Sequence, residues 1–163
     1  MKELHKYKNG FTTIELVVVL IIVSILAATA LPRFFSANSY EEYSYQNELV
    51  STLRAVQLRA MQQTANSVCH SVYINTTQDI VGLLATDTGN ADNCHTSTFH
   101  SDITQIAIDA SHSVNVSSSE ADNKFSFDSL GRPQGCSIPC QVMITGQETL
   151  TVQIESEGYI HAL

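Results

Sequence analysis

The chain has 163 residues and a mass of 17.9 kDa, which is enough for one domain and an extension. Only 15% of its residues are charged, and acidic residues outnumber basic ones 16 to 8. Such an acidic chain is a poor partner for nucleic acid, because the phosphate backbone repels it. The composition also excludes a disordered tail and a collagen-like repeat.

Residues 11–31 form an apolar segment in which Glu15 is the one charged residue. As a helix the segment is about 31 Å long, which matches the hydrocarbon core of a bilayer. It is apolar on every side, so it does not have the single apolar stripe of a surface helix. The rest of the chain has too few large apolar residues to surround it. We therefore predict a transmembrane helix over residues 11–31.

The flanking charges predict the orientation of this helix. Lys2, Lys6 and Lys8 precede it, whereas Arg33 is followed by acidic residues. By the positive-inside rule the N-terminus stays in the cytoplasm and the chain after Leu31 is exported. We therefore expect a single-pass membrane protein whose head is exported.

An ordinary secretory signal peptide is the alternative reading of the same segment. Residues 28–30, Ala-Thr-Ala, fit the small-residue pattern of a cleavage site. Two residues count against it. Glu15 would cost about 2.5–3.5 kcal/mol at mid-membrane, so it indicates a function. Pro32 would stand beside the scissile bond, where its fixed φ hinders an extended substrate.

Residues 8–16 read KNGFTTIEL. This segment resembles the leader-cleavage signature of type IV pilins and pseudopilins: a basic leader ending in glycine, then phenylalanine, and glutamate at the fifth position after the cut. The resemblance implies that residues 1–10 are a leader removed between Gly10 and Phe11 by a prepilin peptidase. It also implies N-methylation of Phe11 and assembly with other pilin subunits on an inner-membrane platform.

Cleavage would create a new α-amino group at Phe11, which has a reference pKa near 8. This cation and Glu15 would lie one helical turn apart, and charges in lipid persist when they are paired. Glu15 can meet its own amine or that of a neighbouring subunit. The resemblance implies the second arrangement, with Glu15 guiding assembly. Alternatively, Glu15 only reaches toward the headgroups.

Pro32 lacks the N–H that would bond to the carbonyl of Ala28, so we predict a helix kink there. Residues 32–66 are expected to continue as an amphipathic helix that packs on the head. Its predicted buried stripe contains Leu49, Leu53, Val56 and Ala60, widened by Val50 and Met61, with Leu58 on the opposite face.

Residues 67–163 alternate in short runs that are typical of antiparallel strands, so we predict a β-rich head domain and an α+β fold. The expected strands are 68–75, 80–84, 103–109, 114–117, 124–128, 142–145, 150–155 and 159–161. Residues 145–148 and 157–158 fit tight turns. The polar stretches 86–98 and 111–123 are expected to be surface loops. One sheet face, carrying Leu150, Val152 and Ile154, should meet the helix stripe.

The four cysteines, Cys69, Cys94, Cys136 and Cys140, all lie on the predicted exported side. An even count in an oxidising compartment indicates disulfides, with three possible connectivities. We expect Cys69–Cys94 and Cys136–Cys140, because the second pair closes a short loop. A metal site is the competing interpretation, since His70 and His95 adjoin cysteines, but only the 136/140 pair has zinc-like spacing.

We expect neither a metal nor a cofactor. The Asp- and Asn-rich loop 87–93 could hold calcium, but it does not match the EF-hand spacing, and such residues are common in turns. The motifs of nucleophilic hydrolases, nucleotide-binding proteins and zinc proteases are absent from the sequence, which indicates a protein that is not an enzyme.

The remainder of the chain also resembles particular members of the family. The helix entering Val68 and Cys69, the segment 125–132 and the closing strands around Gly158 are similar to the H-type minor pseudopilins of type II secretion. Residues 45–57 look most like minor pilins of the mannose-sensitive haemagglutinin pilus. These resemblances imply a minor structural subunit of a type IV pilus. The alternatives are a type II secretion pseudopilin and an exported β-rich binding module.

Overall fold

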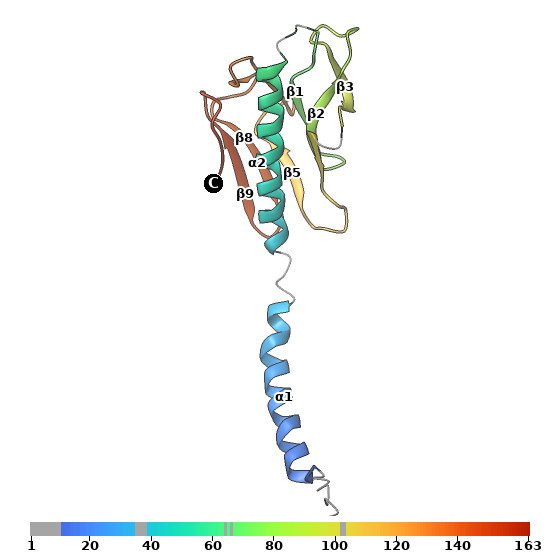
Figure 1. The fold of residues 1–163 in the computed structure, drawn as a ribbon, viewed down its shortest axis with the longest axis vertical. Helices are drawn as coiled ribbons and strands as arrows, with labels where there is room; N and C mark the ends of the chain where they lie inside the picture. The colour runs from blue at the N-terminus through green and yellow to red at the C-terminus, as the bar shows by residue number, and fades with distance from the viewer. Residues whose placement is uncertain (1–10, 35–38, 64, 66, 102–103) are drawn as a thin grey trace, which may run out of the picture. The chain divides into compact units, whose positions relative to one another are not determined.

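The structure is a computed structural model that describes residues 11–34, 39–63, 65, 67–101 and 104–163. The side chains of residues 30–34 and 39 are not described. The chain divides into two compact units, residues 1–37 and residues 38–163. The first contains helix α1 (Thr13–Phe34), and the second contains helix α2 (Ser39–Gln62) and all the described strands (Figure 1).

Helix α1 begins directly after Thr12, which acts as its N-cap. The backbone N–H of Glu15 donates to Thr12 Oγ1 at 3.3 Å, and the N–H of Leu16 donates to the Thr12 carbonyl. A threonine followed three residues later by glutamate is the sequence pattern of a capping box. The kink expected at Pro32 falls where side chains are not described and next to residues 35–38, which lie outside the described residues.

In the part of the chain that the structure describes, no helix combines the length and the hydropathy needed to cross a membrane. The predicted span of residues 11–31 ends two residues inside the region whose side chains are not described. The membrane role of this segment therefore stays a prediction.

Helix α2 buries the stripe that the sequence predicts. Leu49, Leu53, Val56 and Ala60 are buried, and Leu58 on the opposite face is exposed. Two details differ. Met61 is 47% exposed, because it lies in the last turn of a helix that ends at Gln62 rather than at residue 66. Helix α2 also belongs to the same compact unit as the strands, so the head begins near residue 38 rather than at residue 67.

The head contains two antiparallel sheets. Six strands form one sheet in the order β3-β2-β1-β6-β7, with β4 also paired to β2, and four form the other in the order β10-β9-β8-β5. Their bounds are β1 Ser71–Asn75, β2 Ile80–Thr86, β3 Cys94–Phe99, β4 Gln105–Ala107, β5 Asn115–Ser118, β6 Lys124–Phe127, β7 Pro133–Gln134, β8 Cys140–Thr145, β9 Thr149–Ile154 and β10 Ile160–Ala162. The predicted α+β fold, a helix packed on antiparallel sheets, is confirmed.

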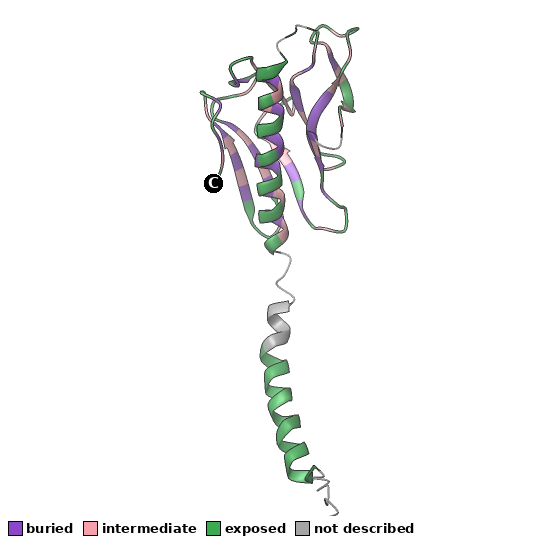
Figure 2. Ribbon diagram, viewed as in Figure 1, coloured by how far each residue is buried: buried purple, intermediate pink, exposed green. Residues whose placement is uncertain are grey.

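Helix α2 covers the inner faces of both sheets, with residues of β9, β10, β8, β2, β4 and β6 against it. In the smaller sheet Val142 lies opposite Val152, and Ile144 lies opposite Leu150. These alternate residues are buried, and α2 contacts both strands; Figure 2 shows buried residues along β8 and β9. The expected contact between the 150–154 strand face and the helix stripe is thus confirmed.

Strand β3 was not expected, because residues 86–98 read as a polar loop. It pairs with β2 through Leu84–Phe99 and Thr86–Cys94, with an irregularity between these pairs. Its middle residues are exposed, since it is the outer strand of its sheet. An edge strand of this kind needs no alternating apolar residues, which explains why the pattern does not predict it. Strand β7, with two residues, was missed as well.

Candidate functional site

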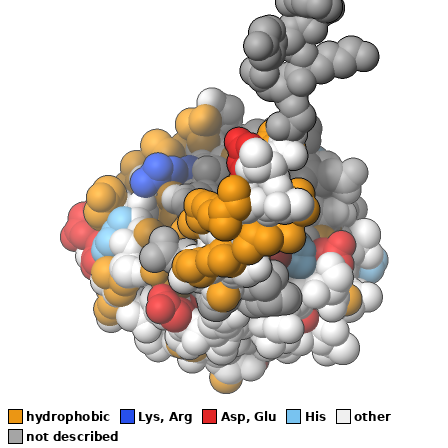
Figure 3. Space-filling view, turned by 90° about the horizontal axis from the view of Figure 1, so that it is seen from below, with side chains coloured by type: hydrophobic (Ala, Val, Ile, Leu, Met, Phe, Trp, Pro, Cys, Tyr) orange, Lys and Arg blue, Asp and Glu red, His pale blue; other side chains and the backbone are white. Residues whose placement is uncertain are grey.

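The side chains of α1 are exposed throughout the described part of the helix, although most of them are apolar. The large apolar residues from Phe11 to Leu26 are between 46% and 81% exposed. Figure 2 shows no buried face on this helix, and the space-filling view from its end shows hydrophobic side chains gathered over it (Figure 3). A soluble protein rarely exposes so large an apolar surface unless that surface contacts lipid or another protein.

The polar side chains inside α1 bond to their own helix. Ser24 Oγ donates to the Leu20 carbonyl at 2.7 Å, and Thr29 Oγ1 donates to the carbonyls of Ile25 and Leu26. Hydroxyl groups satisfied in this way need no water. The polar residues are therefore compatible with an apolar environment around the helix.

The predicted assembly residues lie at the start of α1. Phe11 is 81% exposed, and Glu15 lies in the first turn of the helix. A carboxylate there is stabilised by the helix dipole, because the first N–H groups point toward it. Among the described residues, no basic side chain forms an ion pair with Glu15. Gly10 lies outside the described residues, so the position of the predicted cleavage bond is not described.

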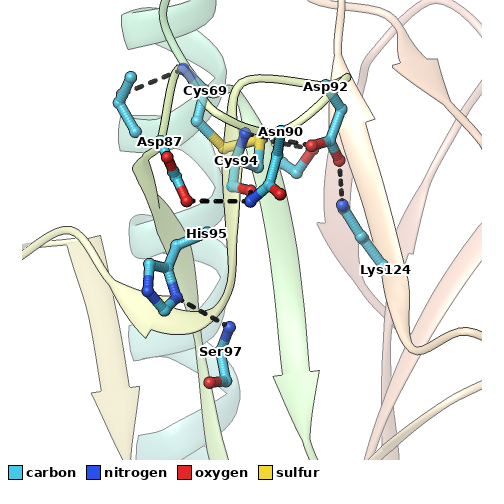
Figure 4. The surroundings of a disulfide bond; sticks show 10 residues. Cys69, Asp87, Asn90, Asp92, Cys94, His95, Ser97 and Lys124 are labelled. Atoms are coloured by element: carbon cyan, nitrogen blue, oxygen red, sulfur yellow. Dashed lines mark hydrogen bonds and ion pairs between the residues drawn. A yellow bond between two sulfur atoms is a disulfide. The ribbon is translucent and has the colours of Figure 1, made fainter.

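The head has two disulfides, and their pairing matches the one expected from the sequence. Cys69 is joined to Cys94 with a Cα–Cα distance of 4.9 Å, and Cys136 is joined to Cys140 with 5.7 Å. The first bond ties the β2–β3 loop to the segment before β1 (Figure 4). Around it, Asn90 Nδ2 donates to Asp87 Oδ2 at 3.1 Å and to the Cys94 carbonyl at 2.7 Å.

Several polar atoms of the Asp- and Asn-rich loop bond to the loop itself. Asp87 Oδ1 accepts the N–H of Gly89, and the N–H of Asp87 donates to the carbonyl of Asn93. Within the described residues, no three His, Cys, Asp or Glu side chains are placed to hold a metal ion. His70 and His95 lie near the disulfide, and His95 Nδ1 accepts the backbone N–H groups of Ser97 and Thr98.

The head surface is strongly acidic. Residues 38–163 contain 14 acidic and 4 basic residues. Two of the basic side chains pair with carboxylates, Lys124 with Asp92 and Arg132 with Asp128. Arg54 instead donates to the Ile160 carbonyl, and Arg59 contacts His100 Nε2 at 2.9 Å. Elsewhere Glu148, and more weakly Glu42, raise the pKa of Tyr43, as neighbouring negative charges do.

Sequence reasoning missed three polar residues on the buried side of α2. Glu42 is 1% exposed and accepts the N–H groups of Gln147 and Glu148 in the β8–β9 turn. The Gln46 side-chain amide donates to the carbonyls of Thr151 and Leu163, and that of Gln57 donates to Gly131 and Gly158. The sequence does contain a sign of these residues: each is a polar residue at a position of the helix that belongs to the buried apolar stripe.

Comparisons with known proteins agree with the N-terminal motif. The family model of the prokaryotic N-terminal methylation motif matches residues 5–31. The chain is 37% identical over 82 residues to the type IV major fimbrial protein FimA of Dichelobacter nodosus. This alignment covers 50% of the chain and 48% of that protein, so the chain spans about half the length of the curated relative it matches.

Among solved structures, the chain is similar to the minor pseudopilin EpsH of the type 2 secretion system of Vibrio cholerae. The similarity has a TM-score of 0.49 at 14% identity, and covers 77% of this chain and 94% of EpsH. The N-terminal region thus carries the prokaryotic N-terminal methylation motif, and the resemblance of this chain to the type IV pilins and pseudopilins is confirmed.

Proposed function

We propose that this chain is a prepilin that becomes a minor structural subunit of a type IV pilus, similar to the minor pilins of the mannose-sensitive haemagglutinin pilus. A prepilin peptidase cleaves it between Gly10 and Phe11, and Phe11 is N-methylated. Residues 11–31 anchor the subunit in the inner membrane with the head in the periplasm. An assembly platform then transfers it into the filament.

The observation that carries this proposal is the exposed apolar helix within the region that matches the methylation motif. In a membrane its side chains contact lipid, and in a filament they contact the same helices of other subunits. Both environments remove the apolar surface from water, which is favourable by about 25 cal/mol per Å². Because lipid is as apolar as the helices, the transfer between the two depends on packing and on pairing of polar groups such as Glu15.

Mass spectrometry of the mature N-terminus tests the processing step. The full chain is produced in a bacterium that has a prepilin peptidase, and the protein recovered from its membranes is digested. We expect a first peptide that begins with N-methylated Phe11. A mature chain that begins at Leu31 would instead support the ordinary signal peptide and an exported binding module.

The type II secretion pseudopilin shares the same processing, so a second measurement separates it from the pilus subunit. Deleting the gene from its own bacterium should reduce surface pili, counted by electron microscopy, while secretion of exoproteins continues. Normal piliation with blocked secretion would assign the chain to a pseudopilus.

A further inference from the structure

The start of α1 is fixed by Thr12, which closely follows the predicted cleavage bond. Phe11 and Thr12 are not helical, and α1 begins at the next residue. The N–H of Glu15 donates to Thr12 Oγ1 at 3.3 Å, and the N–H of Leu16 donates to the Thr12 carbonyl at 3.2 Å. Among the described residues, Thr12 is thus the first whose carbonyl accepts a bond of this helix, as an N-cap carbonyl does.

A second residue of the N-cap type precedes the cleavage bond. Asn9 lies three residues before Thr12 in the sequence, and asparagine and threonine are both favoured N-caps. In a helix that began after Asn9, the Gly10 carbonyl would accept the N–H of Ile14. The cleavage bond would then lie within the first turn of the helix. Which of the two caps is used therefore decides whether this bond is helical.

Hydrolysis of the bond requires a free Gly10 carbonyl. Water adds to this carbonyl, the C–N bond to Phe11 breaks, and the departing nitrogen takes a proton to become the new amine. A carbonyl that accepts an intrahelical hydrogen bond must lose that bond before the chain can enter a peptidase as an extended segment. A substrate that is only partly in the competent form binds with proportionally lower apparent affinity.

We propose that Thr12 is a positioning residue for this cleavage. By capping α1 it starts the helix beyond the cleavage bond and keeps that bond out of the helical hydrogen bonds. The inference rests on the proposed function, since it assumes a prepilin peptidase that acts between Gly10 and Phe11. The match of residues 5–31 to the methylation motif is the independent observation that points to an enzyme at this end of the helix.

Cleavage kinetics of threonine variants test this inference. The full chain and its variants are purified in detergent and treated with a purified prepilin peptidase, and the products are followed by mass spectrometry. Thr12→Val keeps the shape and a similar helix propensity but loses the oxygen that caps the helix. Thr12→Ser and Thr12→Asn keep a capping oxygen. Thr13→Val makes the matched change at the first residue of the helix.

We expect Thr12→Val to raise KM about two- to five-fold, because loss of an N-cap shifts a helix boundary by up to about five-fold. Its kcat should stay unchanged, since the bound segment reacts as before. Thr12→Ser, Thr12→Asn and Thr13→Val should be cleaved with the KM of the unchanged chain.

Removing the competing cap gives a second measurement. In the Thr12→Val chain, the further change Asn9→Ala should restore the original KM, whereas Asn9→Ala alone should have no effect. Amide hydrogen exchange reports the helix start without the peptidase. The Ile14 N–H should exchange more slowly in Thr12→Val than in the unchanged chain, because it then donates to the Gly10 carbonyl.

The inference is overturned if Thr12→Val has the KM of the unchanged chain, or if its kcat falls at constant KM, as loss of a direct contact with the peptidase would cause. It is also overturned if serine and asparagine fail to restore KM. In each case cleavage of the unchanged chain after Gly10 leaves the proposed function intact. Absence of that cleavage would overturn both.

Discussion

Glu42 is a buried carboxylate that closes the β8–β9 hairpin from the start of α2. It accepts the N–H groups of Gln147 and Glu148, the second at 3.1 Å. Removing a charged acceptor leaves two donors unsatisfied at a part-buried site, which costs about 2–3 kcal/mol. We predict that Glu42→Ala lowers the free energy of unfolding by this amount, measured by denaturant titration.

The matched control is Glu48→Ala, which removes an exposed carboxylate from the same helix. It should change the free energy of unfolding by less than about 0.5 kcal/mol. Gly146→Ala should resemble Glu42→Ala, because an added Cβ would collide with the Glu42 carboxylate. Equal effects of the two glutamate variants would show that the contact with the hairpin contributes nothing.

Glu15 has two separable roles at the start of α1. Glu15 stands three residues after Thr12, so it completes a capping-box pattern. In the proposed filament, its charge pairs with the N-terminal amine of a neighbouring subunit. Glutamine at this position keeps the capping pattern but not the charge. We predict that Glu15→Gln and Glu15→Val both insert into the membrane and both fail to enter filaments.

Incorporation is measured by immunoblotting sheared filaments, and insertion by fractionating the membranes. If Glu15→Gln enters filaments as the unchanged chain does, the capping role is sufficient and the charge is not needed for register. The Glu48→Ala variant, which is altered in the head, is the control for expression.

At the scale of elements, the two disulfides differ in the loops they close. Cys69–Cys94 spans 25 residues of sequence, whereas Cys136–Cys140 spans 4. In the loop-entropy model the longer loop contributes about 3.5 kcal/mol and the shorter one about 2 kcal/mol. We predict that replacing the 69/94 pair by alanine destabilises the head more than replacing the 136/140 pair.

Denaturant unfolding of the two double variants measures this difference, with the reduced unchanged chain as a further control. The reduced chain should be less stable than either double variant. A larger loss for the 136/140 pair would contradict the loop-entropy account and assign the difference to packing of the cysteine side chains.

Two histidines, His70 and His100, are affected by the charge of Arg59 in the last turn of α2, and their own charge state affects stability. Burial and, next, the charge of Arg59 lower the pKa of His100, and burial lowers the pKa of His70. A histidine with a lowered folded-state pKa binds protons more readily when the chain is unfolded. Stability is therefore full above the unfolded pKa of about 6.5 and falls as the pH drops below it.

We predict that the free energy of unfolding decreases between pH 7.5 and pH 5.5, and that His70→Gln and His100→Gln each reduce this slope. Thermal unfolding at several pH values measures it. His95→Gln is the control, since His95 is partly buried on the outer strand β3 and its ring bonds to Ser97 and Thr98 of that strand rather than to a charged group. A slope that stays unchanged in the double His70→Gln, His100→Gln variant would assign the pH dependence to other groups.

The apolar pattern predicts the elements of this fold better than their connections. The buried stripe of α2 and the strands around Val152 follow from period and alternation alone, because burial selects apolar residues there. The apolar pattern does not predict strand β3, since its residues are mostly polar and it is held in place by pairing with β2. The pattern does not predict the contacts of Glu42 and Gln57 either. Glu42 bonds to a backbone atom about a hundred residues away, and Gln57 bonds to one about seventy residues away.

The residues of the candidate site also differ in how far they can be predicted from the sequence. The N-terminal motif is local in sequence, so Phe11 and Glu15 can be identified without a structure. The buried polar contacts of Gln46 and Gln57 join α2 to distant segments of the chain, so they can be identified only when the positions of those segments are known. The cysteine pairing is partly predictable from the sequence. The even number of cysteines indicates disulfides, and the short loop between Cys136 and Cys140 favours one of the three possible connectivities.

At the scale of the whole molecule, the two compact units differ in surface chemistry. The described part of residues 1–37 is an exposed apolar helix, whereas residues 38–163 carry 14 acidic and 4 basic residues around a closed core. All residues of the main buried cluster lie between Leu49 and Ile160. This cluster lies within the head, and none of the described α1 side chains belongs to it.

We therefore predict that a fragment of residues 38–163 folds by itself and stays monomeric in water without detergent. Its free energy of unfolding should agree with that of the full chain in detergent within about 0.5 kcal/mol.

The net charge of this fragment is −10 at neutral pH, so copies repel one another, and this repulsion is screened at distances beyond about 10 Å in 0.1 M salt. Any self-association should therefore increase with salt. Analytical ultracentrifugation at low and high salt measures this, and oligomers that are most stable at low salt would contradict it.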